Sequence, residues 1–228
     1  IKTDSKTIAN SEFYNEFYSY FYSKMNSWND LSPLWFEQKK IISDYIINNF
    51  VKDKESDKVR ILSIGCGLGI IEKNIYTEGF HNIHVNEISE TPLRWLKDTI
   101  PQNQIYTGLL HESELENDHY DLIYLVAVDY VFDKKELPIF LKNLSKLLKK
   151  NGQCLVISGS YYETGLLNSI KSNLIHIKKR VTNEDMGQLW GYLRSSSDYK
   201  KAMKNSGYES VFDGMIDNSI YFVKGEMK

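Results

Sequence analysis

The stretch "ILSIGCGLGIIE", residues Ile61 to Glu72, decides the fold of this chain. It joins a short apolar run, typical of a buried strand, to the start of an amphipathic helix. Between the two, Gly65 allows a tight turn, Gly67 lets the backbone approach a ligand, and Gly69 lets the helix begin close to the strand. The first turn of that helix offers unpaired N–H groups to polar or anionic parts of a ligand.

An acidic residue follows at a position that suits a nucleoside ligand. Glu87 lies 18 residues beyond Gly69, at the end of a second predicted strand, "NIHVNE". A carboxylate at this point can accept hydrogen bonds from both hydroxyls of a ribose. Strand, glycine-rich turn, helix, strand and acid, in this order, predict a site for an adenosine-type ligand.

Strands and helices alternate from Val59 to Ser158, and this order predicts the fold class. The predicted strands are "VRILSIG", "NIHVNE", "QIYTG", "YDLIYLVAV" and "QCLVIS". Between them we expect a helix from Ile70, a helix with Thr91 as N-cap and Pro92 in its first turn, and a helix over 137–150 that ends at Asn151-Gly152. The pattern predicts an α/β, doubly wound, mostly parallel sheet with helices on both faces.

Two further regions flank this core. Before it, a helix over 11–25 carries Tyr14, Tyr18 and Tyr22 in one stripe, and a second helix starts at Pro33. After it come a helix over 196–205 and a C-terminal antiparallel β-hairpin around Asp217-Asn218. We therefore expect a single domain over 1–228, with an N-terminal helical cap or lid (1–55), a cofactor-binding core (59–158), a substrate-side insert (159–195), and a final helix and hairpin (196–228).

The composition narrows the partners. The chain of 228 residues has a formal charge of −2, which argues against a nucleic acid partner because phosphate binding needs a concentrated basic surface. No apolar run approaches the roughly 20 residues that cross a membrane, and the first residues lack the apolar core of a signal peptide. A cytoplasmic protein that binds no membrane is the expectation; its oligomeric state stays open. Two isolated cysteines make neither a disulfide framework nor a zinc site.

The spacing of the glycines distinguishes two families of nucleotide-binding loop. A dinucleotide loop has the pattern G-x-G-x-x-G, whereas here the third glycine comes one residue earlier. The stretch "ILSIGCGLG" resembles motif I of the class I, Rossmann-like, seven-stranded S-adenosylmethionine-dependent methyltransferases. The resemblance runs from about Val59 to the end of the chain and includes Glu87, "YDLIYLVAV", "LLKKNGQCLVIS" and the closing hairpin.

The resemblance implies a set of cofactor contacts for S-adenosylmethionine and its product S-adenosylhomocysteine. The glycine loop would pass under the amino-acid part of the cofactor, Glu87 would hold the ribose, and Val126 would lie near the sulfonium. In similar enzymes an N-terminal helix with tyrosines closes over the cofactor. The full set of expected cofactor-binding residues is Tyr14, Tyr22, Gly65, Cys66, Gly67, Glu87, Ile88, Leu109, Leu110 and Val126.

The sequence departs from the family pattern in two places. Ser63 stands where family members usually carry an acid, so the contact to the methionine ammonium differs here. Tyr130-Val131 stands where many relatives have Glu-His, so no base is implied by that motif.

Candidate catalytic residues follow the third and fourth strands. A hydroxyl acceptor needs a base, and Asp129, Tyr130 and His111 are the candidates at that end of the sheet. We expect substrate contacts from the insert, by Tyr161, Tyr162, Trp190, Tyr192 and Arg194. No cluster of His, Asp and Glu suggests a metal.

The expected function is methyl transfer to a small molecule, such as a sugar, a phosphorylated compound or a secondary metabolite. Oxygen is the first choice of acceptor atom and nitrogen the second. Two alternatives stay open: a nicotinamide-dependent oxidoreductase on a similar sheet, and a non-catalytic cofactor-binding protein.

Overall fold

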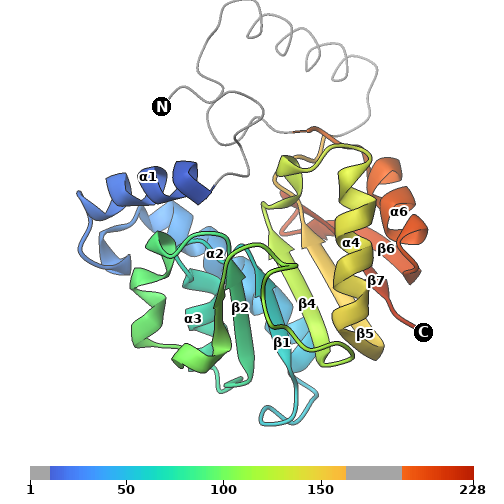
Figure 1. Cartoon of the computed structure of the whole chain (residues 1–228), viewed down its shortest axis with the longest axis horizontal. Helices are drawn as coiled ribbons and strands as arrows, with labels where there is room; N and C mark the ends of the chain where they lie inside the picture. Colours follow the sequence, from blue (N-terminus) through green and yellow to red (C-terminus); the bar gives the residue numbers. More distant parts are fainter. Residues whose placement is uncertain (1–10, 163–191) are drawn as a thin grey trace, which may run out of the picture.

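A computed structural model describes residues 11–162 and 192–228, and within them a seven-stranded sheet forms the centre of the molecule (Figure 1). The strand order is β3-β2-β1-β4-β5-β7-β6. The strands are β1 Ile61–Ile64, β2 Ile83–Glu87, β3 Ile105–Thr107, β4 Tyr120–Val126, β5 Leu148–Ile157, β6 Glu209–Ile216 and β7 Ile220–Glu226.

The sheet is parallel from β3 to β5, and β7 runs antiparallel to both of its neighbours. The predicted doubly wound sheet with a C-terminal antiparallel hairpin is thus confirmed. Strand β1 pairs with β2 on one side and with β4 on the other. The connections that leave β1 and β4 therefore turn to opposite sides of the sheet, which is where ligands bind in folds of this kind.

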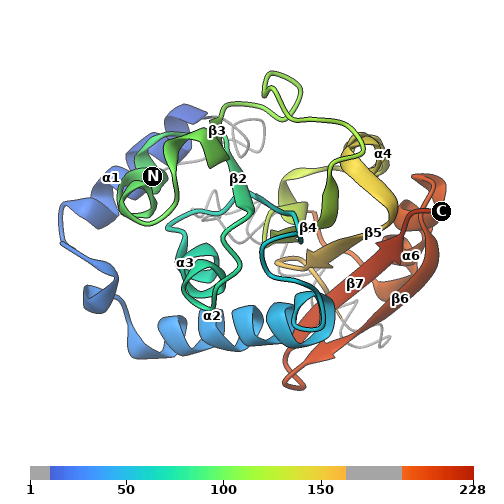
Figure 2. The same cartoon turned by 90° about the horizontal axis from the view of Figure 1, so that it is seen from below.

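Helices cover both faces of the sheet (Figure 2). Residues of α2 (Pro33–Ile46) and α3 (Ile70–Thr77) belong to the core on one face, and residues of α4 (Glu136–Leu147) and α6 (Ser196–Asn205) to the core on the other. The remaining elements are α1 Ser11–Tyr22, the π-helical turn η2 Ile47–Val51, and short 3₁₀ turns η1 Trp28–Asp30, η3 Thr91–Arg94, η4 Leu96–Asp98, η5 Gln102–Gln104 and η6 Asp129–Val131.

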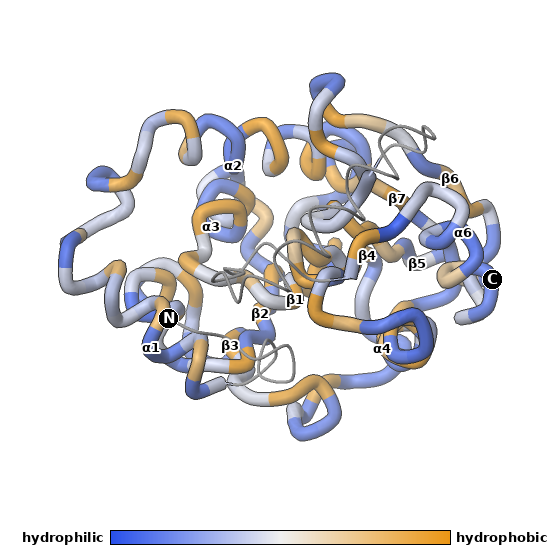
Figure 3. The backbone as a smooth tube through the Cα atoms, turned by 90° about the horizontal axis from the view of Figure 1, so that it is seen from above, coloured by the Kyte–Doolittle hydropathy of each residue, from blue (hydrophilic) through white to orange (hydrophobic). Residues whose placement is uncertain are grey.

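Successive side chains along a strand point to opposite faces of the sheet, and so they belong to two separate hydrophobic cores. In β1 the side chain of Ile61 packs toward α2 and α3, and that of Leu62 packs toward α4 and α6. Side chains two apart in a strand share a face, so a buried strand feeds both cores at once. The colours of α2, α3 and α4 in Figure 3 change between orange and blue along each helix, as expected for helices with one buried side.

The helix that the sequence predicts at Thr91 is replaced by two 3₁₀ turns, η3 and η4. The expected N-cap role of Thr91 is wrong: Glu90 precedes the turn, and the Thr91 hydroxyl donates a hydrogen bond to Asn15 Oδ1 of α1 (2.7 Å). Pro92 and Pro101 also bracket a segment too short for a stable α-helix. This segment instead anchors α1 beside the sheet.

The predicted end of the helix that follows the fourth strand is also wrong. Helix α4 ends at Leu147, and β5 begins at Leu148, so Asn151-Gly152 lies within the strand. The six residues from Leu148 to Gln153 on β5 lie opposite the three from Tyr120 to Leu122 on β4, so the register shifts at a bulge. The backbone N–H of Asn151 donates to Met227 O (2.9 Å), and Asn151 has a positive φ of 62°, so the turn preference of Asn-Gly is met within the strand at this bulge.

The closing hairpin forms where the sequence places it. Asp217 (φ 48°) and Asn218 (φ 55°) both adopt positive φ, and the N–H of Ser219 donates to Ile216 O (3.1 Å). Two consecutive positive φ values are what a type I′ turn requires, and Asp and Asn tolerate them.

The residues over 11–162 and 192–228 include no helix that combines the length and apolar character of a membrane span.

The bulge in β5 yields a stability prediction. A Cβ added at Gly152 would lie 2.8 Å from Lys149 O and 2.9 Å from Tyr120 O, both backbone atoms. We expect Gly152→Ala to lower the free energy of unfolding by about 1–3 kcal/mol, because the backbone there must move. Chemical denaturation monitored by circular dichroism measures the change.

Gly214→Ala in β6 is the matched control. Its Cβ would meet the Phe222 ring at 3.1 Å rather than a carbonyl oxygen. A ring shifts more readily than paired backbone, so we expect a change within about 1 kcal/mol. Equal losses in the two variants would contradict the account of the bulge.

Candidate functional site

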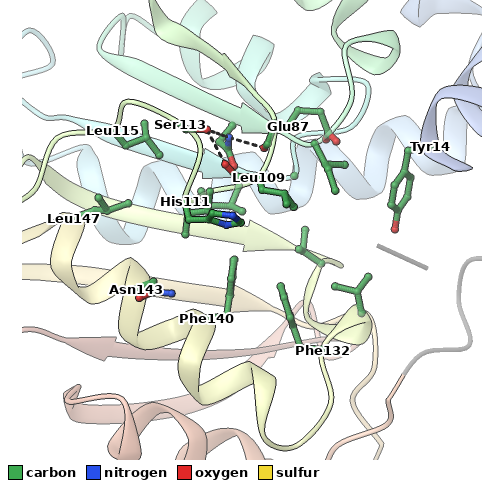
Figure 4. Close-up of a pocket in the computed structure, with 18 of the residues that line it drawn as sticks. Tyr14, Glu87, Leu109, His111, Ser113, Leu115, Phe132, Phe140, Asn143 and Leu147 are labelled. Carbon is green, nitrogen blue, oxygen red and sulfur yellow. Dashed lines mark hydrogen bonds between the residues drawn. The ribbon is translucent and has the colours of Figure 1, made fainter. Parts of the chain in front are cut away.

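A cavity of about 510 Å³ opens at the carboxyl ends of β1, β2, β3 and β4 (Figure 4). Its walls come from the loops after these strands, from α1 and from one side of α4. Among its lining residues are eight that the sequence predicts for the site: Tyr14, Gly65, Glu87, Ile88, Leu109, Leu110, His111 and Tyr130. The structure thus brings together residues from five separate segments of the chain.

The glycine loop adopts a conformation that only glycine accommodates well. Gly65, Gly67 and Gly69 all have positive φ, at 68°, 55° and 74°. A Cβ on Gly65 would lie 2.5 Å from Val128 Cγ2, and one on Gly67 would lie 2.7 Å from the hydroxyl oxygen of Tyr18. The loop is therefore held between the segment after β4 and helix α1, with its backbone close to both cavity walls.

Glu87 ends β2 and is 5% exposed, yet it lines the cavity. Its Oε2 accepts a hydrogen bond from the N–H of Gly67 (3.0 Å). Burial raises the pKa of Glu87 to about 7, against the opposing effect of N–H groups from Gly67, Ile88 and Ser89. A carboxylate of this kind favours a ligand that donates hydrogen bonds to it, as the hydroxyls of a ribose do.

A polar residue that sequence reasoning missed shapes the loop after β3. Asn86 is buried in β2, and its Nδ2 donates to Gly108 O (3.2 Å) and to Ser113 Oγ (2.9 Å). These bonds hold the loop against β2 and bring Leu109 and Leu110 to the cavity, as Figure 4 shows for Leu109. The signal in the sequence is an asparagine inside an otherwise apolar strand, where an unpaired amide would be costly.

Two tyrosines of α1 line the large cavity, and one of them, Tyr18, also lies against the glycine loop. Tyr14 and Tyr18 both line the cavity, their rings stacked at 6.4 Å, and the hydroxyl of Tyr14 lies 2.9 Å from that of Tyr130. Tyr22 is placed elsewhere: its hydroxyl donates to Pro92 O (2.7 Å) and its ring packs edge-on against Trp95. Of the three tyrosines in this stripe, Tyr14 and Tyr18 thus lie at the site, and Tyr22 anchors the helix.

A second, smaller cavity of about 70 Å³ lies on the other side of Tyr18. Cys66, Gly67 and Val126, three residues predicted to contact the cofactor, line this cavity instead of the larger one. Ser63 lines it too, and its hydroxyl donates to Glu72 Oε1 (2.6 Å). The residue that departs from the family pattern is therefore paired with a carboxylate from α3.

The structure does not bring Asp129 to the cavity, and its expected role as a base is corrected to a structural one. Asp129 is fully buried, and its carboxylate accepts hydrogen bonds from Ser158 Oγ (3.0 Å), Gly159 N (3.0 Å), Ser160 Oγ (2.6 Å) and the hydroxyl of Tyr199. These donors come from the end of β5 and from α6. The Asp129 carboxylate thus links the segment after β4 to the end of β5 and to α6.

Arg194 is likewise occupied rather than open to a substrate. It is 2% exposed, and its guanidinium donates to Asp129 O (2.9 Å), Tyr192 O (3.0 Å), Phe132 O and Asp133 O (3.2 Å). A buried guanidinium with this many carbonyl partners fixes a loop. The predicted contact of Arg194 with a substrate is corrected accordingly.

The other substrate candidates from the insert are dispersed. Tyr161 stacks on Tyr221 with ring centroids 3.8 Å apart, Tyr162 is half-buried and donates its N–H to Arg194 O, and Tyr192 is exposed. None of these three belongs to the lining of either cavity described above. Trp190 lies outside the described residues.

His111 is exposed and lines the large cavity, as Figure 4 shows. Tyr130 is buried and lines it as well. Of the three catalytic candidates, these two face the space where a ligand would lie. Among residues 11–162 and 192–228, no three His, Cys, Asp or Glu side chains are grouped so that they would hold a metal ion.

The hydrogen bonds of Asp129 predict a structural effect. We expect Asp129→Asn to lower the free energy of unfolding by about 2–4 kcal/mol, because an amide NH₂ would face a set of donors in a buried site. Asp118→Asn, at an exposed position with φ 51°, is the control and should change it by less than about 0.5 kcal/mol. Wild-type stability in Asp129→Asn would overturn the structural role.

The raised pKa of Glu87 predicts a pH-dependent stability of the protein without ligand. Between about pH 4.5 and pH 7 the unfolded chain releases the Glu87 proton while the folded chain retains it. The free energy of unfolding should therefore fall as pH rises through this range, by on the order of 3 kcal/mol from this group. Subtracting the values for Glu87→Gln, from denaturation series at several pH values, isolates the effect. A difference that is flat over this range would contradict it.

Comparisons with solved structures show the same fold in several methyltransferases. Magnesium protoporphyrin IX methyltransferase from Synechocystis PCC 6803, with bound S-adenosylhomocysteine, matches with a TM-score of 0.67 and 14% identity, over 99% of this chain and 100% of that one. A putative S-adenosylmethionine-dependent methyltransferase from Methanococcus maripaludis matches with a TM-score of 0.58 and 16% identity, over 100% and 95%.

A third structure is a phosphoethanolamine N-methyltransferase from Haemonchus contortus, in complex with phosphomonomethylethanolamine and S-adenosylhomocysteine. It matches with a TM-score of 0.56 and 16% identity, over 76% of this chain and 38% of that one. At such identities these likenesses show a shared fold alone. No curated protein sequence matches the chain.

A family model described as "Methyltransferase domain" matches residues 34–211, which include the glycine loop and most of the sheet. The match covers well over half of the 228 residues. On this match and on the seven-stranded sheet with its reversed strand, the chain belongs to the methyltransferase-domain family, among the class I S-adenosylmethionine-dependent methyltransferases.

Proposed function

We propose that the protein transfers a methyl group from S-adenosylmethionine to a small molecule, with a hydroxyl oxygen as the first choice of acceptor. The observation that carries this proposal is the position of Glu87: a buried carboxylate with a raised pKa, beside the glycine loop, on the wall of a large cavity. The cavity lies where the strand order changes direction, which is the usual ligand position in this class of fold.

The residues present fit the proposed cofactor. Glu87 would accept hydrogen bonds from the ribose, and Ile88, Leu109 and Leu110 would pack on the adenine. Gly67 would keep the backbone close to the ligand, since a Cβ there would collide with Tyr18. When bound, the cofactor supplies an activated methyl group on its sulfonium.

The rest of the cavity suits a small acceptor with an apolar or aromatic part. Val131, Phe132 and Phe140 form one side, and the polar groups of His111 and Tyr130 face the same space. A total of about 510 Å³ lies within the range of sites for drug-sized ligands. This volume favours a compact molecule over a macromolecule.

A hydroxyl acceptor must lose its proton, and His111 is the side chain that we propose as the base. It stands at the cavity wall, whereas the Asp129 carboxylate is fully engaged with four donors. Tyr14 and Tyr18 would exclude water from the reacting atoms by covering the loop. A nitrogen acceptor remains the second choice, and a biosynthetic role in the cytoplasm remains a prediction.

Binding of the cofactor is the first test. Isothermal titration calorimetry should show that S-adenosylmethionine and S-adenosylhomocysteine bind the full chain. Glu87→Gln should weaken binding by about tenfold to a hundredfold, because a charge-assisted hydrogen bond contributes about 1.5–3 kcal/mol. Glu90→Gln, at an exposed acid three residues away, is the control and should bind as the wild type does.

The acceptor is found by turnover. The protein is incubated with labelled S-adenosylmethionine and a metabolite extract, and the labelled product identifies the acceptor and the methylated atom. A product methylated on oxygen that His111→Ala forms far more slowly supports the proposed base. Cofactor binding without any labelled product would favour a non-catalytic binding protein, and no binding at all would refute the cofactor.

A further inference from the structure

The small cavity beside the glycine loop contains a carboxylate that the proposed function has not used. Glu72, on the first turn of α3, is 2% exposed. Its Oε1 accepts hydrogen bonds from Ser63 Oγ (2.6 Å) and from the hydroxyl of Tyr124 (2.8 Å). Its Oε2 has no partner among the described residues, where Gln104 Oε1 is the one other buried side-chain atom in that condition.

Burying such a carboxylate costs free energy unless a cation or further hydrogen-bond donors contact it. Burial raises the pKa of Glu72, because a buried negative charge is poorly solvated. Lys39 of α2 lines the same cavity and lowers the pKa of Glu72 through its charge, but it makes no hydrogen bond to Oε2. The cavity thus contains one acid and one base that are held apart.

The position of this cavity indicates what fills it. Gly65 lines the large cavity, Cys66 and Gly67 line the small one, and Tyr18 lines both. A ligand whose ribose meets Glu87 and which continues along the glycine loop would extend toward the cavity that Glu72 and Lys39 line. The volume of about 70 Å³ admits a group of a few heavy atoms. An acid and a base across such a space match the ammonium and the carboxylate of an α-amino acid.

We propose that the small cavity binds the amino-acid end of the cofactor, with Glu72 as the acceptor for its ammonium and Lys39 as the partner of its carboxylate. This inference rests on the proposed function and assigns two residues within it. Ser63 and Glu72 act as a pair: the serine leaves the end of β1 uncharged, and the carboxylate reaches the same place from the neighbouring helix. Ser63 and Tyr124 orient Glu72 by donating to one oxygen, which leaves the other for the ligand.

The test compares ligands that differ only at this end. S-adenosylhomocysteine carries ammonium and carboxylate, its decarboxylated analogue carries the ammonium alone, and 5′-methylthioadenosine carries neither. Binding of each is measured by calorimetry with the full chain and with Glu72→Gln. Glutamine keeps an oxygen for Ser63 and Tyr124 to donate to, so the variant retains the local hydrogen bonds.

We expect Glu72→Gln to weaken the binding of S-adenosylhomocysteine and of its decarboxylated analogue by about tenfold to a hundredfold. The binding of 5′-methylthioadenosine should weaken by less than about threefold. Lys39→Met should weaken S-adenosylhomocysteine and leave the decarboxylated analogue nearly unchanged. Glu78→Gln, at an exposed acid that ends the same helix outside the small cavity, is the control and should change all three affinities by less than about threefold.

The outcomes separate this inference from the proposed function. If wild-type protein binds 5′-methylthioadenosine and S-adenosylhomocysteine, and Glu72→Gln weakens both equally, Glu72 is a structural residue and the inference is overturned while the cofactor stands. The same conclusion follows if the variant weakens neither. If the wild type binds none of the three ligands, the proposed function itself fails.

Discussion

The parallel pairing of β1 with β2 on one side and β4 on the other is the constraint on which the rest of this structure depends. It sends the connection after β1 and the connection after β4 to opposite faces of the sheet, so that the carboxyl ends of the two strands border a space between diverging loops. The glycine loop occupies one edge of that space. Val128, after β4, approaches Gly65 so closely that a side chain there would collide with it.

Three buried acids show how one kind of group acquires different roles from its surroundings. Asp129 has its carboxylate filled by donors from β5 and α6, and so it joins elements of the fold. Glu87 accepts N–H groups but faces a cavity, so part of its capacity is left for a ligand. Glu72 has one oxygen occupied and the other without a partner among the described residues, which makes it the acid most in need of an external cation.

Helix α1 connects these groups to the surface. Asn15 accepts hydrogen bonds from Ser89 and Thr91, and Tyr22 donates to Pro92 O, so one side of the helix is tied to the segment after β2. The same tyrosine stripe places Tyr14 against Tyr130 and Tyr18 against the glycine loop. The same helix thus bridges the two cavities, because the ring of Tyr18 lines both. A ligand along the glycine loop would lie beneath it.

Local patterns in the sequence determined the class of sheet, the glycine loop, the position of Glu87 at a strand end and the closing hairpin. Each of these depends on residues that are close together in the chain. Periodicity identifies a buried strand, and glycine spacing identifies a turn, without knowledge of distant contacts. The sequence also showed that Ser63 departs from the family pattern, and it left that departure without an explanation.

Only the tertiary structure decided which polar side chains face the cavities. Asp129 and Tyr130 are neighbours in the chain, yet the first is turned to β5 and the second to the large cavity. Arg194 is closed off by carbonyl groups from segments more than 60 residues away. Glu72 meets Ser63 because α3 packs back over the strand that precedes it. Such pairings depend on how helices and loops pack against the strands, and the local sequence pattern does not specify that packing.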